Sequence, residues 1–382
     1  MEIQGGNLFY GHTNIIREYT AYSSILPLPI GIQHGWLPLA SKDDADVDSI
    51  LPELWVWSDR IKKEYDTLGL NKNIRVIGAP IIYIECEQNE GKEKKGTIAF
   101  PGHSSHCVDI IGDYEKYAEQ LAGLSEEFHP ITICLYYLDI AKGYSNVFER
   151  KGFKVVSNGD MLAKEFLYNF IDNVGKCKYA TTNEISSACL YASYLGLKVF
   201  YYGLQFDYFN NSDPHHPNGY VYVYKEALIK ELKEKWSFKN IGQYEQQREF
   251  AKKELGVEHK KSPEELKDIL KLYNKKIGVY FKRLSLKIKE KRLSQFYDEC
   301  SEFKRAGKNE ESLAGFDFLV KELANSISLE QKEKYIGGAY FHIGEIYLKK
   351  GDLKRAEQAF KNCLNYNKEH KKAVDYLQVK VK

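Results

Sequence analysis

The 382-residue chain has no excess of either charge, few cysteines and no long apolar run. Its 55 Lys and Arg against 53 Asp and Glu leave a net charge of +2, which argues against a nucleic-acid binder with its strong basic excess. The seven cysteines are scattered without a CxxC pair, which argues against a disulfide framework and a zinc site. No apolar run approaches the roughly 20 residues that span a bilayer, and residues 1–30 lack a signal-peptide pattern. These absences predict a soluble, cytoplasmic protein.

Hydrophobic residues make up 43% of the chain and aromatic residues 14%, enough for a sizeable core. This composition excludes intrinsic disorder as the main state. A length of 382 residues predicts two or three domains, since a domain has roughly 100–200 residues.

Residues 1 to about 225 combine short apolar runs with Gly, Pro and Asn breaks, and helix-length segments separate most of these runs. Strands that are apolar on both faces and alternate with helices are typical of a parallel sheet covered on both sides. The sequence therefore predicts an α/β fold here. The expected strands include 74–77, 96–100, 131–137, 154–156 and 198–202, and the expected helices are 114–124, 143–151, 161–173 and 186–196.

The charged segment 85–95 has no hydrophobic periodicity and lies between two strand-rich blocks, so it is expected to be a linker. It divides the α/β part into a first unit, 1–84, which is small for a domain, and a second unit, 96–235. Residues 236–382 are rich in Lys, Glu, Leu and Tyr and are expected to be helical throughout.

Within the helical region, residues 337–370 match the pattern of a tetratricopeptide repeat, with small residues where two antiparallel helices cross and large ones where they interdigitate. The matching positions are Tyr340, Ile343, Gly344, Tyr347, Gly351, Ala356, Phe360 and Cys363. A weaker copy has Phe296, Cys300, Phe303, Gly307, Ser312, Phe316 and Leu319 in the same register. Two units fall short of the three that a stable array usually needs, so the helical stretch 266–293 is expected to supply the missing layer.

A first candidate site is the segment 181–188, where Asn183, Glu184, Ser186 and Ser187 precede a predicted helix. Hydroxyl groups beside the unpaired N–H groups of a helix start suit a phosphate. The alternative is that the serines only cap the helix. A strand ends near Ala180, which places the pair at a strand's carboxyl end, where open α/β sheets bind ligands.

A second candidate is the turn 100–106, in which a buried strand ends in Pro-Gly and is followed by His103, Ser104 and His106. Contact with a phosphate or a ribose is the favoured interpretation. The alternatives are a plain turn with a helix cap, and a metal site in which Asp109 joins the two histidines, although their spacing matches no known ligand pattern.

A third candidate is His34, which lies in a Gly-rich turn, 31–38, after an apolar stretch. The ordinary pKa of an imidazole suits a general base near neutral pH, although a histidine in such a loop can also be structural. Asp43, Asp44 and Asp46 follow as a second acid/base candidate, for which a solvated loop is the alternative.

These three segments, in this order on a two-unit α/β chain, resemble the GT-B class of glycosyltransferases. Ser186-Ser187 is similar to the Ser-Ser motif of bacterial sialyltransferase-like and Kdo-transferase-like enzymes, and residues 100–104 and His129-Pro130 loosely resemble their HP motif. The segments 33–38 and 181–207 resemble a His-Gly turn and a Ser-Ser stretch of the polyol-phosphate transferases. Residues 57–60 and 76–80 are similar to the end of their first domain.

The resemblance implies two Rossmann-like units with a metal-independent transferase site between them, and no DxD motif stands where the donor site of a metal-dependent enzyme would need one. The implied donor is a nucleotide-activated sugar, with cytidine monophosphate as the expected nucleotide, and the implied acceptor is a bacterial surface glycan or glycoconjugate. No separate cofactor or metal is expected. The expected catalytic residues are His34 and Asp44, and the expected donor-binding residues are His103, Ser104, Asn183, Glu184, Ser186 and Ser187. The alternative is a tetratricopeptide scaffold that binds a protein partner and whose α/β part is not catalytic.

The stretch 271–292 carries nine Lys or Arg against one acidic residue, interleaved with apolar side chains. A basic amphipathic helix can lie on an anionic bilayer, so peripheral contact with the inner face of the cell membrane is one expectation. The other is a helix that packs its apolar stripe on the tetratricopeptide units.

Overall fold

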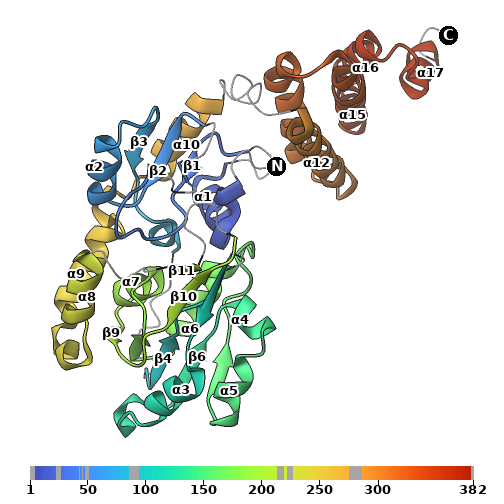
Figure 1. The fold of residues 1–382 in the computed structure, drawn as a ribbon. Helices are drawn as coiled ribbons and strands as arrows, with labels where there is room; N and C mark the ends of the chain where they lie inside the picture. Colours follow the sequence, from blue (N-terminus) through green and yellow to red (C-terminus); the bar gives the residue numbers. More distant parts are fainter. Residues whose placement is uncertain are drawn as a thin grey trace.

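The computed structural model confirms a mixed α/β part with parallel sheets, followed by an all-helical part (Figure 1). It describes residues 5–22, 27–42, 44, 46–47, 51–85, 94–105, 107–212, 219–221, 227–274 and 286–379. Within these ranges, no helix has the length and apolar character that crossing a membrane requires. The central part of the expected linker, 86–93, lies outside the described residues.

The first unit is a three-stranded parallel sheet in the order β1-β2-β3, formed by Gly31–Ile32, Glu53–Val56 and Asn73–Val76. Its helices are α1 (His12–Thr20) and α2 (Asp59–Thr67). All four residues of β2 are buried, as expected for a central parallel strand.

Two later helices adjoin this small unit: α10 (Pro263–Asn274) packs on α1, while α9 (Tyr244–Glu254) packs on α7 (Ser187–Tyr194) of the second unit and reaches the first unit through Glu254. Leu255, Leu266 and Leu270 share one buried core with residues of α1. The sequence groups these helices with the repeats, and it also assigns Leu266 and its neighbours to a third repeat layer. In the structure these three leucines instead complete the core of a first unit that is too small to bury its own apolar surface.

The second unit is a five-stranded parallel sheet in the order β7-β6-β4-β8-β9. The strands are β4 (Thr97–Phe100), β6 (Ile131–Cys134), β7 (Lys154–Val156), β8 (Tyr179–Thr182) and β9 (Lys198–Tyr201). The chain runs outward from β4 through β6 to β7, then crosses back and continues outward through β8 and β9. The strand order therefore reverses between β4 and β8, and ligands bind beside such a switch point in open α/β sheets.

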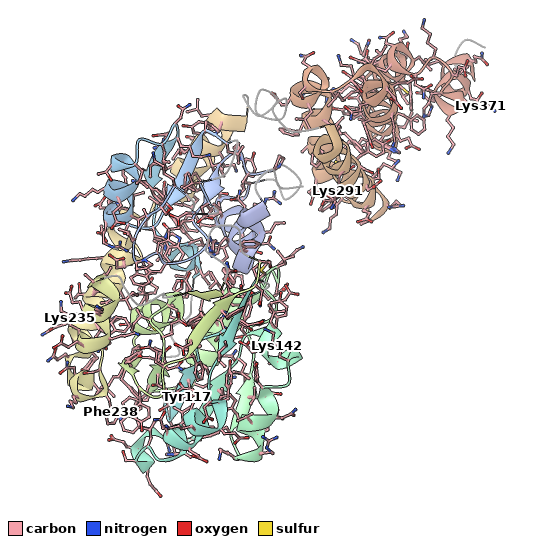
Figure 2. All side chains as sticks on the ribbon, in the orientation of Figure 1. Tyr117, Lys142, Lys235, Phe238, Lys291 and Lys371 are labelled. Atoms are coloured by element: carbon pink, nitrogen blue, oxygen red, sulfur yellow. The ribbon has the colours of Figure 1, made fainter. Side chains whose placement is uncertain are left out.

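Helices cover both faces of this sheet (Figure 1). They are α3 (Tyr114–Ala122), α4 (Tyr137–Ala141), α5 (Ser145–Arg150), α6 (Phe166–Val174), α7 (Ser187–Tyr194) and α8 (Ala227–Lys235). Neighbouring strand residues alternate between two cores: Ile98 packs on the side of α6 and α7, while Ala99 packs on the side of α3 and α5. Tyr117 of α3 is fully buried there, whereas Lys235, Lys291 and Lys371 project from helix surfaces (Figure 2).

A small antiparallel sheet, ordered β11-β10-β5, was not predicted from the sequence. Its strands are β5 (Val108–Ile111), β10 (Asp207–Asn210) and β11 (Gly219–Val221). Asp and Asn disfavour strands, and pairing between segments about 100 residues apart leaves no local pattern in the sequence.

The helical part contains two antiparallel helix pairs and a last helix (Figure 1). Its helices are α12 (Leu286–Arg305), α13 (Asn309–Phe318), α14 (Leu329–Gln331), α15 (Gly337–Lys349), α16 (Leu353–Tyr366) and α17 (Lys371–Val379). The crossing of α15 and α16 needs Gly344, because a Cβ there would lie 2.6 Å from the Phe360 ring. Leu51 of the first unit joins the buried core of these helices.

Half of the basic stretch 271–292 lies outside the described residues, which here end at 274 and resume at 286. Its membrane contact therefore stays a prediction.

Candidate functional site

A cavity of about 300 Å³ lies between the two α/β units. The second unit lines it with residues that follow the carboxyl ends of β4, β6 and β7 and with the first residues of α7. The first unit contributes Tyr10, His34 and Gly35. Of the residues expected from the sequence, His34, His103, Ser186 and Ser187 line this one cavity, although the other three lie 69 to 153 positions after His34 in the sequence.

His34 is paired with a buried carboxylate. Its Nδ1 lies 3.0 Å from each carboxylate oxygen of Asp46, and its backbone N–H donates to Asp46 Oδ2 at 3.0 Å. Asp46 is almost fully buried, while about a third of the His34 side chain is exposed. The negative charge of Asp46 raises the pKa of His34. With Nδ1 fixed in this way, Nε2 is the nitrogen available for proton transfer at the cavity.

Asp44, the carboxylate expected to act with His34, has a different role in the structure. It accepts hydrogen bonds from the Ser41 N–H and the Tyr65 hydroxyl, both at 2.7 Å, and it is not among the cavity-lining residues. Burial raises the pKa of Asp44. Asp43, the third member of the group, lies outside the described residues. Asp46 is therefore the carboxylate that orients the imidazole.

Ser186 and Ser187 stand at the start of α7, directly after β8. The Ser186 side chain makes no capping hydrogen bond to the helix, so the cap alternative does not describe it. Ser187 Oγ accepts the backbone N–H of Trp36 at 2.9 Å, which joins α7 to the turn that carries His34. Both serines face the cavity beside the positive end of the helix dipole.

His103 follows β4 and lines the cavity with Tyr136, which follows β6. Their ring centroids are 4.6 Å apart, and His103 Nδ1 lies 3.0 Å from the carbonyl oxygen of Ser104. When Nδ1 donates to that carbonyl, Nε2 is left as the acceptor.

Ser104 and Asn183, expected to bind the donor, instead hold the loops together. The buried Ser104 hydroxyl donates to Asp139, and Lys142 Nζ donates to Ser104 Oγ at 3.0 Å. Asn183 accepts the Gly102 N–H at 2.8 Å and donates to the Leu204 carbonyl at 2.7 Å. Neither residue lines the cavity, because these bonds turn both side chains into the protein.

Glu184 also lies outside the cavity lining. Its carboxylate packs against Gly102, where an added Cβ would lie 2.8 Å from Glu184 Oε2. Burial raises the pKa of Glu184 to about 8, against the opposing effect of the Lys233 charge. The His129-Pro130 dipeptide precedes β6, so it lies at the opposite end of the sheet from the cavity.

Tyr10 is a cavity residue that the sequence did not indicate. It has the left-handed backbone angles φ 57° and ψ 21°, which cost a non-glycine residue about 1–3 kcal/mol. Its N–H donates to the Met161 carbonyl at 2.6 Å, and its ring lies 4.8 Å from that of Phe166. Strained residues gather at functional sites, but no local sequence pattern marks this one.

His12 lies behind Tyr10 and is completely buried, with ring centroids 5.9 Å from Tyr10 and 6.5 Å from Trp57. Neither of its ring nitrogens has a hydrogen-bond partner among the described residues. Burial, with a smaller effect of the His34 charge, lowers the pKa of His12 to about 3. His12 is therefore neutral around pH 7.

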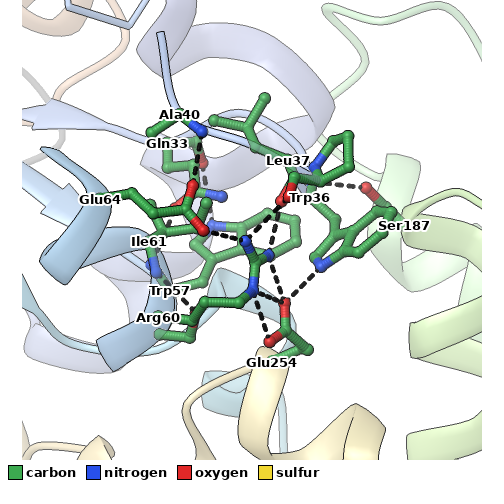
Figure 3. Close-up of polar contacts among 12 residues, drawn as sticks. Gln33, Trp36, Leu37, Ala40, Trp57, Arg60, Ile61, Glu64, Ser187 and Glu254 are labelled. Atoms are coloured by element: carbon green, nitrogen blue, oxygen red, sulfur yellow. Dashed lines mark hydrogen bonds and ion pairs between the residues drawn. The ribbon is translucent and has the colours of Figure 1, made fainter. Parts of the chain in front are cut away.

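The turn that carries His34 is held by a buried polar network (Figure 3). Glu254 of α9 accepts the Trp36 Nε1–H at 2.6 Å and two N–H groups of Arg60, from Nε at 2.9 Å and from Nη2 at 2.6 Å. Arg60 also donates to the Leu37 and Pro38 carbonyls, at 2.6 and 3.1 Å. The sequence did not indicate this network, because its members are up to 218 positions apart.

The described residues that line the cavity include no Lys, Arg, Asp or Glu. His34 and His103 are the lining side chains that can become positively charged, and six aromatic rings give the cavity a largely apolar surface. These rings belong to Tyr10, Phe100, Tyr136, Phe166, Phe170 and Tyr191. Such a cavity suits a ligand that combines rings with a small negative charge.

The metal alternative for the 100–106 turn gains no support from the described residues. His106 lies outside them, and the Asp109 carboxylate is paired with Lys142 and Asn211. A group of ligand atoms within 4.8 Å of one another occurs instead at the surface, in Asp59, Glu258 and His259. His259 Nε2 lies 2.9 Å from Asp59 Oδ2, which an ordinary surface hydrogen bond explains.

Comparison with known proteins finds one family match, a tetratricopeptide repeat at residues 337–370. It confirms the repeat expected from the sequence in this register. No curated protein and no solved structure matches the chain. The match covers the helical part alone and supports a protein-binding role there, since stacked repeats of this kind present binding surfaces.

Proposed function

We propose that the cavity between the α/β units is a transferase site that moves a sugar from a nucleotide-activated donor to a hydroxyl group of a glycan or glycoconjugate. The observation that carries this proposal is that His34, paired with Asp46, lines the same cavity as Ser186, Ser187 and the start of α7. In this proposal His34 is the general base and the two serines form the phosphate site, the two functions that sugar transfer without a metal requires.

In the proposed reaction, the acceptor hydroxyl oxygen attacks the anomeric carbon of the donor, and the bond from that carbon to the phosphate oxygen breaks. His34 Nε2 takes the hydroxyl proton, and Asp46 stabilises the imidazolium that forms. The nucleotide leaves with the bonding electrons. Its growing negative charge is stabilised by the hydroxyls of Ser186 and Ser187 and by the helix dipole, more in the transition state than in the ground state.

The charge of the cavity favours a donor with one phosphate, as in cytidine monophosphate sugars. A diphosphate brings at least two negative charges, which proteins commonly neutralise with a metal, Lys or Arg. The described cavity lining has none of these side chains, and offers two histidines, hydroxyl groups and a helix start. The same lining supports His103 as a contact to the phosphate or the ribose.

Two experiments test the proposal. Thermal-shift measurements with CMP, CDP, UDP and GDP should show stabilisation by CMP, since a ligand at about 100 times its Kd adds about 2.7 kcal/mol. The double variant Ser186→Ala/Ser187→Ala should lose this shift and transfer activity while remaining folded. Ser193→Ala is the matched control, because Ser193 is buried in the same helix, does not line the cavity and has no hydrogen-bond partner among the described residues. Wild-type binding and activity in the double variant would remove the proposed donor site.

The second candidate function is a protein-binding scaffold, which the tetratricopeptide match at 337–370 favours. In that case the α/β units are an inactive module and the helical part is the functional one. The absence of a thermal shift with any of the four nucleotides would favour this function over the transferase.

A further inference from the structure

The turn 33–38 is fixed separately on its two sides. On the amino side, the Gln33 side chain accepts the Trp57 N–H at 2.9 Å, and the Gln33 carbonyl accepts Trp57 Nε1–H at 3.0 Å. These bonds lie within the first unit, so they hold the turn on its own sheet. They do not fix its distance from α7.

The carboxyl side of the turn is attached to elements outside the first unit, through Trp36 (Figure 3). The backbone N–H of Trp36 donates to Ser187 of α7, and its indole N–H donates to Glu254 of α9. One residue, two positions from His34, therefore joins the first unit to both helices. The place of this turn over the cavity therefore depends on where α7 and α9 hold Trp36.

Glu254 is the centre of this attachment. It is 5% exposed, and its two oxygens accept hydrogen bonds from three N–H groups of Trp36 and Arg60. Arg60 in turn donates hydrogen bonds to the carbonyl groups of Leu37 and Pro38, so the position of Glu254 also constrains these two residues. A buried carboxylate with this many donors has a single favourable geometry, and removing its charge leaves buried donors without an acceptor.

We infer that Glu254 is a positioning residue for the transferase: from α9 it sets the turn of residues 33–38 so that His34 faces the donor site at the start of α7. The inference rests on the proposed function for the role of His34, but not for the contact itself. Glu254 does not line the cavity and acts only through Trp36 and Arg60.

The main test is Glu254→Gln, which keeps the size of the side chain but turns an N–H donor toward Arg60. Trp36→Phe is the second variant, which removes the indole N–H and leaves the pairing of Arg60 with Glu254. Glu53→Gln is the matched control. Glu53 is also buried, accepts hydrogen bonds from Arg75 Nε at 2.6 Å and from the Tyr273 hydroxyl, and joins α10 to the first unit away from the cavity lining.

Three measurements on the full chain separate positioning from stability. They are the affinity for CMP, the kcat for sugar transfer per folded molecule, and the titration of His34 by NMR of labelled histidine. We expect Glu254→Gln to bind CMP within about twofold of the wild type and to lose roughly ten- to a hundredfold in kcat, since small misplacements of reacting groups have effects of this size. Trp36→Phe should show the same pattern to a smaller degree.

The His34 titration does not depend on the proposed function. The charged groups that influence it are Asp46 and Asp44, since the neighbouring His12 is neutral. Loosening of the turn weakens the contact with Asp46, so the pKa of His34 should move toward its ordinary value in Glu254→Gln and stay unchanged in Glu53→Gln.

Wild-type kcat and an unchanged His34 titration in folded Glu254→Gln would overturn the inference, as would equal losses in Glu53→Gln. If Glu254→Gln does not fold, Trp36→Phe decides by the same criteria. If the wild type neither binds CMP nor transfers sugar, the proposed function fails, while the His34 titration still decides whether Glu254 positions the turn.

Discussion

The imidazole of His34 is held by Asp46, and not by Asp44, which is two residues nearer along the chain and faces Tyr65. Both carboxylates belong to the same short loop. The bonds from Asp46 reach the ring and the backbone N–H of His34 together, which fixes the tautomer and the ring orientation at the cavity.

Replacing Asp46 should therefore affect turnover far more than replacing Asp44. We expect Asp46→Asn to lower kcat about a hundredfold, because the imidazolium formed during proton transfer loses its counter-charge. Asp44→Asn should keep kcat within about twofold and lose about 1 kcal/mol of stability with the Tyr65 hydrogen bond. Steady-state kinetics and urea unfolding of both variants check this. Equal losses of kcat would contradict the assignment.

The pH dependence of turnover tests the same pairing of His34 with Asp46. Asp46 raises the pKa of His34, and only the neutral imidazole can accept a proton, so wild-type turnover should rise as the pH passes upward through that pKa. In Asp46→Asn the pKa falls, so the rise should begin at a lower pH and end at a lower plateau. A rise at the same pH in both proteins would show that another group controls it.

The burial of His12 in its neutral form should make the protein less stable in acid. The folded chain holds this histidine neutral down to about pH 3, whereas the unfolded chain protonates it below its ordinary pKa of 6.5. Stability should therefore fall as the pH drops below 6.5, by about 2 kcal/mol at pH 5. His12→Phe fills the same space without a titrating group, so it should remove this part of the acid sensitivity.

Urea unfolding at pH 5 and pH 7.5 measures the effect. All four Trp residues lie between positions 36 and 236, so their fluorescence reports the α/β part alone. An unchanged difference between the two pH values in His12→Phe would contradict the prediction.

The burial of Glu184 should give stability the opposite pH dependence. Its pKa of about 8 in the folded chain lies above the ordinary value of 4.5. The stability that its neutral form contributes is therefore complete below pH 4.5 and is lost as the pH rises through 8. Glu184→Gln should thus stabilise the protein at pH 8.5 and have little effect at pH 4. The gain should be about 2 kcal/mol, less than the full pKa shift would give, because the side chain is partly exposed. Equal effects at both pH values would show that burial does not keep this carboxyl group neutral.

Local patterns in the sequence predicted the second unit well, because its strands are short apolar runs with clear breaks. The positions of the Pro-Gly-His turn and the Ser pair followed from the same reasoning, since each comes directly after a predicted strand. Both segments flank the switch between β4 and β8.

Contacts that depend on distant parts of the chain could not be predicted in this way. The first unit is completed by Leu255, Leu266 and Leu270. Their apolar spacing predicts that they are buried, but it does not predict which residues they pack against. The choice of Asp46 over Asp44 is set by the path of one loop, and the inward orientation of Ser104 is set by Asp139, 35 positions away.

The crossing of α15 and α16 gives a final prediction, which concerns the helical part. Gly344→Leu gains about 0.8 kcal/mol in helix propensity but forces side-chain atoms into the Phe360 ring, and overpacking of this kind costs about 1–3 kcal/mol. We expect a net loss of about 1–2 kcal/mol, confined to α15, α16 and α17. Lys349→Leu adds the same side chain at an exposed position of the same helix, so it is the matched control.

Hydrogen exchange should then be faster throughout α15–α17 in Gly344→Leu and unchanged in Lys349→Leu. The Trp fluorescence transition should be the same in both variants, because the α/β part has its own cores and contains every Trp residue. Retained protection in Gly344→Leu would show that the helix pair can separate at this crossing without loss of stability. A changed fluorescence transition would show that the helical part, through its contact with Leu51, supports the first unit as well.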